Sequence, residues 1–501
     1  MDGVSFSAEP LALVSFVAYL LLIILIGLYA SRFSSQGISE YFVGGRRMNR
    51  FVVALSAVVS GRSAWLLLGV TGMAWSVGVQ AVWSVIGYIV VEVWLFLYYA
   101  RRLRRFAEVH NVITIPDFFA ARFPAQEKLI RIVLVAIILI FMSGYVSAQF
   151  VAGGKTFVSG FGIDPLWGIG ITAAIVLLYT VLGGFLAVSL TDVLQGFLML
   201  FALVLMPVLL IAHLGGWAFV VAELTAFDPL LLDPYALGLG AAIGGLAIGL
   251  GSPGNPHIIS RYLSIENESQ LKTACVVGTL WNVLMAWGAL FIGLAGRVMF
   301  PELSMLPGAD TENLFPHVAQ TLLHPVFFGL VMAAVFAAIM SSADSQLLVA
   351  ASSLVRDVVE KMLGQGQQIP QQRLVRLSRL VVVILVAVSL TLGYLAQDLV
   401  FWLVLFAWAG LGAAIGPTSV LALYWRRTTG YGVVAGMIAG ASVTIIWRLT
   451  DSLRALSYEL IPGFLAGLLV TVIVSLLTSP PDSADEHFKT MDPSSPKQNP
   501  S

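Results

Sequence analysis

Apolar stretches alternate with short polar or basic segments along almost the whole chain. A helix needs about 20 mainly apolar residues to cross the hydrocarbon core of a bilayer. Thirteen stretches meet this requirement and are predicted to be transmembrane helices: 10–31, 51–76, 79–100, 129–152, 165–186, 191–213, 236–257, 272–297, 325–351, 379–396, 399–424, 432–449 and 457–478. The pattern therefore predicts an all-α polytopic membrane protein.

The placement of basic residues predicts the orientation of these helices. With the N-terminus outside, alternate loops on the inner side collect 22 of the 27 Lys and Arg residues, and the outer loops hold four. Positively charged loops stay on the cytoplasmic side. The last basic residue, Arg62, falls inside a predicted helix. We expect an inner-membrane protein with its N-terminus outside and its C-terminus in the cytoplasm.

Composition excludes several classes of protein. Of the 501 residues, 58% are apolar and 11% are charged, and the mean hydropathy is +0.92. These values are far from those of a soluble enzyme or a disordered chain. No phosphate-binding loop, zinc spacing or nucleic-acid motif occurs, so an ATP-driven pump and a nucleic-acid partner are not expected. Residues 479–501, rich in Pro, Ser and Asp, are expected to be a disordered cytoplasmic tail.

Two predicted helices carry residues that interrupt a helix. The second reads SAVVSGRSAW over residues 56–65, and the seventh reads GLGSPGNPH over residues 249–257. Proline removes a backbone donor, and glycine weakens a helix. Interrupted helices at corresponding places in two halves point to the central site of a transporter. Close packing of glycines between helices is the alternative explanation.

The ninth predicted helix carries side chains whose oxygen atoms could bind a cation. It reads AAIMSSADSQ over residues 337–346. Hard cations prefer several oxygen ligands, such as carbonyls and hydroxyls. Ser341 and Ser342 offer hydroxyls, although serines in a membrane helix often bond their own backbone. Asp344 follows two residues later and is expected either to coordinate a cation or relay a proton, or to hydrogen-bond near the inner helix end.

The sequence resembles the sodium:solute symporter family, and within it the bacterial sodium/proline symporters. The resemblance rests on short motifs that occur in family order between residues 10 and 478: EYFVGGR at 40–46, IPDFF at 115–119, GGFLAVS at 183–189, Thr191-Asp192, Pro256-His257, the 337–346 run and AWAG at 407–410. No organic cofactor is implied, and sodium is the implied coupling ion.

The resemblance implies a transporter domain over 1–478 with an inverted five-plus-five helix repeat. Residues 51–213 would form the first repeat and 236–424 the second, with the first helix and residues 432–478 peripheral. Sodium would bind the carbonyls of Val59, Arg62 and Ala338 and the hydroxyls of Ser341 and Ser342. Asp192 matches an acid on the family's sodium exit path, or is a cytoplasmic loop carboxylate.

The solute is expected midway through the membrane. The candidate binding residues lie on the two interrupted helices and on the fourth predicted helix: Ser63, Ala64, Trp65, Tyr145, Ser252 and Pro256. Proline carriers have an Asp at the position of Gly61, an apolar residue at Arg62 and a small residue at Glu92. The aromatic residues that they place on the seventh helix fall at Ile248 and Ser252. These departures weaken the case for proline and for ordinary sodium coupling.

Arg62 and Glu92 are predicted to lie at similar depth. The turn between their helices centres near residue 77, and each residue is 15 positions from it. An unpaired Arg at mid-bilayer costs about 2.5–3.5 kcal/mol on the milder scale. We therefore expect the two side chains to form a buried pair. The alternative is that Glu92 faces another helix or a water-filled cavity and Arg62 reaches water alone.

The function predicted is sodium-coupled uptake of a small organic solute by alternating access, with lipid, sodium and solute as partners. L-proline leads by resemblance, followed by another amino acid or a small carboxylate. One alternative is a sodium-independent carrier or exchanger in which Arg62 acts as a tethered cation. A transporter-like sensor is less favoured, because only about 23 polar residues follow the last helix.

Overall fold

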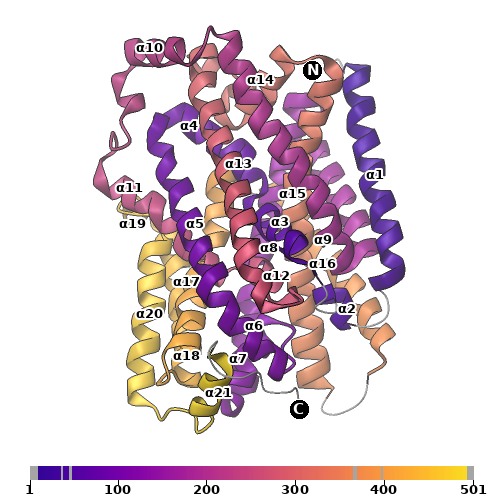
Figure 1. Ribbon diagram of the computed structural model, residues 1–501, viewed down its shortest axis with the longest axis vertical. Helices are drawn as coiled ribbons and strands as arrows, with labels where there is room; N and C mark the ends of the chain where they lie inside the picture. The colour runs from indigo at the N-terminus through magenta and orange to yellow at the C-terminus, as the bar shows by residue number, and fades with distance from the viewer. Residues whose placement is uncertain (1–8, 35–37, 45–47, 365–368, 396–398, 493–501) are drawn as a thin grey trace.

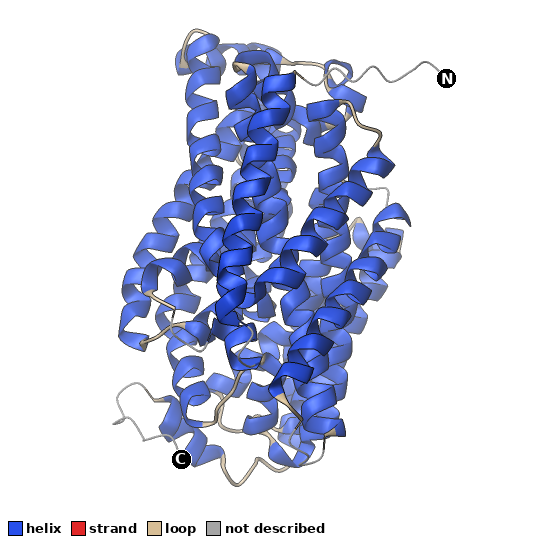
Figure 2. Cartoon of the chain, turned by 90° about the vertical axis from the view of Figure 1, so that its right-hand side faces the viewer, coloured by secondary structure: helices blue, strands red, loops and turns tan. Residues whose placement is uncertain are grey.

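The computed structural model describes residues 9–34, 38–44, 48–364, 369–395 and 399–492. Within these ranges the chain is helical throughout, apart from turns and one isolated bridge between Met48 and Ile265. Figures 1 and 2 show a tall bundle of long helices that run roughly side by side. Ten of the described helices are long and apolar enough to cross a membrane, which defines a multi-pass membrane protein.

The first half of the chain forms the helices α1 (Pro10–Ser34), α2 (Ile38–Val43), α3 (Arg50–Ala64), α4 (Thr71–Val77), α5 (Val82–Trp94), α6 (Ala100–Val109), α7 (Ile115–Arg122), α8 (Glu127–Phe161), α9 (Pro165–His213) and α10 (Trp217–Phe227). The second half forms α11 (Gly238–Ala247), α12 (Pro256–Ser264), α13 (Leu271–Met299), α14 (Leu314–Leu322), α15 (Pro325–Ser352), α16 (Gln371–Leu395), α17 (Val400–Tyr424), α18 (Gly430–Leu449), α19 (Asp451–Arg454), α20 (Leu460–Leu477) and α21 (Ala484–Met491).

Burial separates the centre of the bundle from its edge. In the most apolar 18-residue stretch of α15 and of α17, 83% of the residues are buried, whereas in α1 and α20 only 28% are buried. A helix that is apolar all round is buried in a large core or faces lipid. Helices α1 and α20 stand at opposite sides of the bundle in Figure 1. The chemistry of the protein is therefore expected around α15 and α17.

Side-chain caps fix where the central helices begin. The Oδ1 atom of Asn49 accepts from the backbone N–H groups of Phe51 and Val52, both at 3.0 Å, at the start of α3. Asp164 caps α9 in the same way, followed by a proline at the first helical position. Both caps satisfy N–H groups that a helix N-terminus leaves free.

The two predicted helix interruptions are confirmed. Helix α3 breaks at Ser63, whose φ of 49° and ψ of −172° leave the helical region, and the chain continues through a short π-helix (Trp65–Val70). Helix α11 passes into a 3₁₀ segment (Ile248–Gly254), and α12 begins only after the extended Asn255. Positive φ at a non-glycine residue such as Ser63 is unusual and occurs where surrounding structure enforces it.

A third interruption lies where a turn between two helices is expected. Residues 187–190 are helical, within α9, and the break falls earlier, at Gly184 with φ 62°. Glycine adopts positive φ without steric penalty, so Gly184 accommodates the change of backbone conformation that an L-residue resists.

The expectation of a disordered tail is wrong for part of it. Residues 484–491 form α21, and 493–501 lie outside the described residues. The side chains of His487, Phe488 and Met491 are buried, and the His487 ring packs edge-on against Phe106 of α6. Apolar residues at helical spacing bury one face of this short segment, which composition alone does not reveal.

Candidate functional site

The broken helix α3 meets α15 at the centre of the bundle. The hydroxyl of Ser342 donates to the carbonyl oxygen of Ser60 at 2.9 Å, one turn before the break at Ser63. Ser341 donates to the carbonyl of Ala338 in its own helix at 3.1 Å. Because the break leaves nearby backbone groups without helical partners, carbonyl and hydroxyl oxygens gather at this junction.

All five predicted sodium ligands are on the two helices of this junction, in a buried environment. Val59 lies in α3 one residue before Ser60, and Ala338, Ser341 and Ser342 lie in α15. The fifth, Arg62, would contribute its carbonyl from the last turn before the break. Oxygens of this kind suit a hard monovalent or divalent cation.

The side chain of Arg62 turns toward α5 and α13. Its Nη2 atom is paired with Glu92 Oε1, and its Nε atom donates to Asn282 Oδ1 at 2.7 Å. Asn282 in turn donates to Glu92 Oε2 at 2.6 Å. The predicted Arg62–Glu92 pair is thus confirmed, with Asn282 as a third member. All three side chains are almost fully buried.

An aromatic ring completes the environment of this guanidinium. Its central carbon lies 3.7 Å from the centroid of the Tyr88 ring, and Nη1 donates to the carbonyl of Gly61 at 3.3 Å. A desolvated cation over a ring face is held by cation–π attraction. Every nitrogen of the Arg62 guanidinium therefore has a partner, and the side-chain partners come from α5 and α13 rather than α15. This geometry gives no support to Arg62 as a tethered cation beside Ser341 and Ser342.

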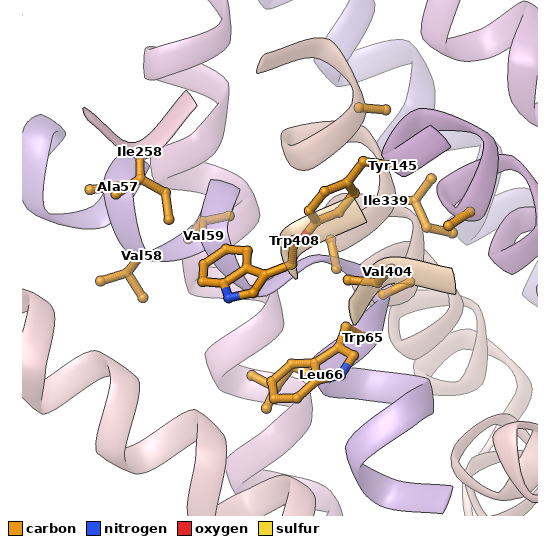
Figure 3. Close-up of a cluster of buried hydrophobic side chains, with 14 of the residues drawn as sticks. Ala57, Val58, Val59, Trp65, Leu66, Tyr145, Ile258, Ile339, Val404 and Trp408 are labelled. Atoms are coloured by element: carbon orange, nitrogen blue, oxygen red, sulfur yellow. The ribbon is translucent and has the colours of Figure 1, made fainter. Parts of the chain in front are cut away.

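A small cavity beside the break brings together residues from six segments. It is lined by Gly61, Arg62, Trp65, Tyr88, Tyr145, Ile248, Val404, Leu405 and Trp408. Trp65 stacks on Phe401 with ring centroids 5.6 Å apart and closes one side. Figure 3 shows Trp65 of the π-helix, Tyr145 of α8, and Val404 and Trp408 of α17 close to one another. The cavity has room for about one water molecule, so a larger solute fits only when these helices separate.

Two of the six predicted solute-binding residues line the central cavity, and the other four do not. Trp65 and Tyr145 line the central cavity. Ser63 forms the break, where its hydroxyl accepts from the N–H of Trp65 at 3.1 Å, and Ala64 donates its N–H to Gln149 Oε1 at 3.2 Å. Ser252 is buried in the 3₁₀ segment but does not line this cavity, and Pro256 lines a separate one.

A second buried charge cluster lies on the other side of the junction. Asp192 of α9 accepts from the hydroxyls of Ser56 at 2.5 Å and Ser60 at 3.2 Å, and lies 3.3 Å from Arg261 Nη2. Arg261 also donates to Ser345 at 2.5 Å. Asp192 is therefore fully buried against α3, and the alternative of a cytoplasmic loop carboxylate is wrong.

Asp344 lies beside this cluster on α15. Its Oδ1 atom accepts from the hydroxyl of Ser345 at 3.1 Å, and its Oδ2 atom has no partner among the described residues. The side chain is fully buried. With Asp192 nearby, two carboxylates share the single positive charge of Arg261, an arrangement that favours binding of a cation or a proton.

Ion-pair clusters lie beyond the cavity at both ends of the bundle. Near the end that carries α14, Lys155 of α8 bonds Asp310 at 2.7 Å and Glu312 at 2.6 Å. Glu312 also accepts from the N–H groups of Val400 and Phe401, at the start of α17. Burial raises the pKa of Glu312, against the opposing effect of Lys155. The carboxylate therefore connects α8 to the cap of α17.

The cluster at the opposite end joins α7, α8 and the extension of α15. Arg131 lies 2.9 Å from Asp117 and is paired with Asp357, which also accepts from Thr114 at 2.9 Å. Arg356 lies 3.3 Å from Asp117. Buried charges of this kind are strongly destabilising when one partner is removed.

Three residues of the centre were missed by sequence reasoning. Asn282, Arg261 and Gln149 each sit in a predicted helix or next to one, and each bonds a residue of α3. Polar side chains within apolar segments were the available signal, because such residues face the bundle interior. Their partners depend on helix packing, which the sequence pattern does not specify.

Comparison with known proteins places the chain in a family. The model of the sodium:solute symporter family matches residues 41–440. The high-affinity proline transporter PutP of Bacillus subtilis is 40% identical over 470 residues, covering 92% of this chain and 97% of the relative. The sodium/proline symporter of Staphylococcus aureus is 36% identical over 477 residues, covering 92% of each.

A solved structure agrees in fold. The structure of a Na⁺-coupled sialic acid symporter in a substrate-bound, outward-open state superposes with a TM-score of 0.80, at 20% identity, over 95% of this chain and 99% of that one. The matching family and these relatives are transporters, which makes this chain a secondary transporter rather than an enzyme. The chain belongs to the sodium:solute symporter family.

Proposed function

We propose that this protein carries L-proline, or another small amino acid, into the cell together with sodium by alternating access. The observation that carries the proposal is the junction of α3 and α15, where Ser342 bonds the Ser60 carbonyl one turn before the break. Hydroxyls and released carbonyls meet there in a buried environment, as a sodium ion requires. The names of the relatives, a proline transporter and a sodium/proline symporter, support the pairing of solute and ion.

We place the sodium ligands at the carbonyls of Val59, Arg62 and Ala338 and the hydroxyls of Ser341 and Ser342. Support comes from the position of all five on the two helices of the junction. Asp192 would take the ion next on its way inward, since it accepts from the hydroxyl of Ser60, the residue whose carbonyl accepts from Ser342. Sodium binding between α3 and α15 would hold these helices together and so favour one conformation.

The solute would bind in the cavity between Trp65, Tyr145 and Trp408. An aromatic lining suits an amino group through cation–π attraction and an apolar ring through burial. Arg62 would contribute little net charge there, because Glu92 neutralises it. This charge balance favours a zwitterion over a dianion and supports an amino acid ahead of a dicarboxylate.

The membrane arrangement belongs to the same proposal. We propose thirteen transmembrane helices in the inner membrane, with an inverted five-plus-five repeat and the N-terminus outside. The distribution of basic residues supports this orientation. In this orientation the Lys155–Glu312 cluster lies on the outer side and the Arg131–Asp357 cluster on the inner side. Opening of the bundle toward the outside would separate the outer cluster while the inner cluster stays paired, and opening toward the inside would do the reverse.

Uptake by the purified protein in liposomes tests the proposal. With an inward sodium gradient, radiolabelled L-proline is expected to accumulate above its external concentration. Replacing external sodium by choline is expected to abolish accumulation. Uptake that persists unchanged in choline would favour the sodium-independent alternative, and no proline uptake in either buffer would refute the assigned solute.

A further inference from the structure

Six buried polar atoms without a partner among the described residues lie at or beside the two helix breaks. They are Trp65 Nε1, Gln149 Nε2, Ser252 Oγ, Asn255 Oδ1 and both ring nitrogens of His257. Each of these residues is buried. Native proteins leave few buried polar groups unpaired, so each such group requires an explanation, for example a functional role or a bound water or ion. The breaks thus offer hydrogen-bonding capacity that the chain does not use internally.

His257 is the most unusual of these groups. Its side chain is fully buried and both nitrogens lack a partner. The ring centroid lies 5.8 Å from that of Tyr145, with an interplanar angle of 76°, and 6.5 Å from that of Trp408, with an angle of 69°. Tyr145 and Trp408 both line the central cavity, and the imidazole packs against these two rings without lining the cavity itself. A movement of either ring that opens the cavity would expose the imidazole to it.

Local structure determines where this imidazole points. His257 follows Pro256 in the first turn of α12, directly after the extended Asn255. Residues four apart share a helix face, and Arg261 on the same face donates to the His257 carbonyl at 2.8 Å. Arg261 bonds Asp192, Ser60 and Ser345, which fixes the rotation of α12. The imidazole therefore occupies a defined position rather than a mobile one.

A structural role explains this residue poorly. A buried ring that serves only to fill space needs no polar atoms, and unpaired nitrogens make histidine inferior to phenylalanine for packing. Metal binding is not indicated, because no group of three His, Cys, Asp or Glu side chains is positioned for it in the part of the chain that the structure describes. The remaining explanation is a hydrogen-bond partner for the imidazole that enters the central cavity from outside the protein.

We infer that His257 is a specificity-determining residue that hydrogen-bonds the amino group of the transported solute. The inference rests on the proposed function. The neutral imidazole has one acceptor nitrogen, and the ammonium group of an amino acid supplies N–H donors. Tyr145 and Trp408 pack edge-on against the imidazole and line the same cavity, where an aromatic ring face attracts a positive group. The recognised class is an α-amino or α-imino acid rather than a simple carboxylate.

Two solutes that differ at one atom test this assignment. L-Proline carries a ring ammonium, whereas tetrahydrofuran-2-carboxylate has an ether oxygen there and cannot donate. Uptake and competition are measured in liposomes for the wild type, His257→Phe, His257→Asn and the control His213→Asn, which changes an exposed histidine at the end of α9. Thermal stability of each purified variant reports folding.

His257→Phe is expected to raise the KM for proline about tenfold or more and to leave affinity for the ether analogue nearly unchanged, because only the hydrogen bond to the amino group is lost. The preference for proline over the analogue then collapses. His257→Asn keeps an acceptor oxygen at shorter reach, so a smaller loss of the same preference is expected. His213→Asn should behave as wild type.

An unchanged preference in a folded His257→Phe variant would overturn the inference while leaving the proposed function intact. If that variant does not insert, the Asn variant decides alone, and wild-type preference there overturns it equally. Absence of proline uptake by the wild type is a different result, because it refutes the proposed solute itself.

Discussion

Arg62 of α3 and Glu92 of α5 form an ion pair in the interior of the bundle, and Asn282 of α13 bonds both of them. The triad joins three helices at the side of the helix break. Removing one partner of a buried pair leaves an uncompensated charge, whereas removing both leaves none. This asymmetry gives the first prediction.

Arg62→Met and Glu92→Ala are each expected to destabilise the protein by about 3–5 kcal/mol, and the double variant by clearly less than the sum. Thermal unfolding of purified protein in detergent, with expression level as a second readout, measures the three changes. Arg454 and Asp451 form an exposed pair at 2.8 Å and serve as the control, for which losses below about 1 kcal/mol are expected. Strictly additive losses at Arg62 and Glu92 would contradict the role of the pair.

Gly61 gives a second prediction, because little space surrounds it. A Cβ atom there would lie 3.1 Å from Ile258 Cδ1 and 3.9 Å from Glu92 Oε1. Gly61→Asp would set a second carboxylate against Glu92 and compete for Arg62, so transport should fall about tenfold or more. Gly61→Ala tests size alone and should cost less. Combining Gly61→Asp with Glu92→Ala should restore part of the activity, and failure of Glu92→Ala to relieve Gly61→Asp would disprove the electrostatic explanation.

The serines of α15 give a third prediction. Ser341→Ala and Ser342→Ala each remove one hydroxyl at the junction with α3, and the sodium concentration for half-maximal uptake should rise about tenfold or more. Ser352→Ala, further along the same helix, removes only a bond to the helix backbone and is the matched control. Titration of proline uptake against sodium measures the change. Wild-type sodium dependence in both junction variants would exclude these hydroxyls as ligands.

The docking of α21 should depend on pH. The buried ring of His487 faces His110, and Arg122 lies within 3.5 Å. Burial, together with Arg122 and His110, lowers the pKa of His487 from 6.5 to about 4. A docked state that binds fewer protons is fully stable above the ordinary pKa and weakens as the pH falls from 6.5 toward 4.

Hydrogen exchange of the α21 amides, corrected for the intrinsic rate at each pH, measures this docking. Protection is expected to decline between pH 6.5 and pH 4 in the wild type. His487→Phe keeps an aromatic ring but does not titrate, so most of the decline should disappear. Equal decline in both proteins would assign the effect to another group.

The sequence pattern predicted those features of the fold that depend on residues close together in the chain. Glycine and proline in 249–257 interrupt any helix, and the second central break occurs there. The first break falls at Ser63, two residues after Gly61, where the surrounding structure enforces a positive φ. The Arg62–Glu92 pair followed from equal depth in one hairpin, a relation that sequence distance captures. Asn282 is 190 residues from Glu92, and only the packing of α13 against α5 brings the two together.

Features that depend on tertiary contact were not predictable. Pro256 lines a different cavity from Trp65, although both belong to interrupted helices, because the extended Asn255 turns the chain between them. The helix α21 forms from a tail of disordered composition because Phe488 and Met491 find a buried surface. Gly184, rather than the residues expected in a turn, carries the break in α9.

The central claim is that the junction of α3 and α15 couples a sodium ion to movement of the solute. Proline uptake into liposomes is measured under an inward sodium gradient, with choline replacement and with the Ser342→Ala variant beside the wild type. We predict accumulation that requires sodium in the wild type and needs a higher sodium concentration in the variant. Accumulation of equal rate in sodium and in choline would contradict the claim.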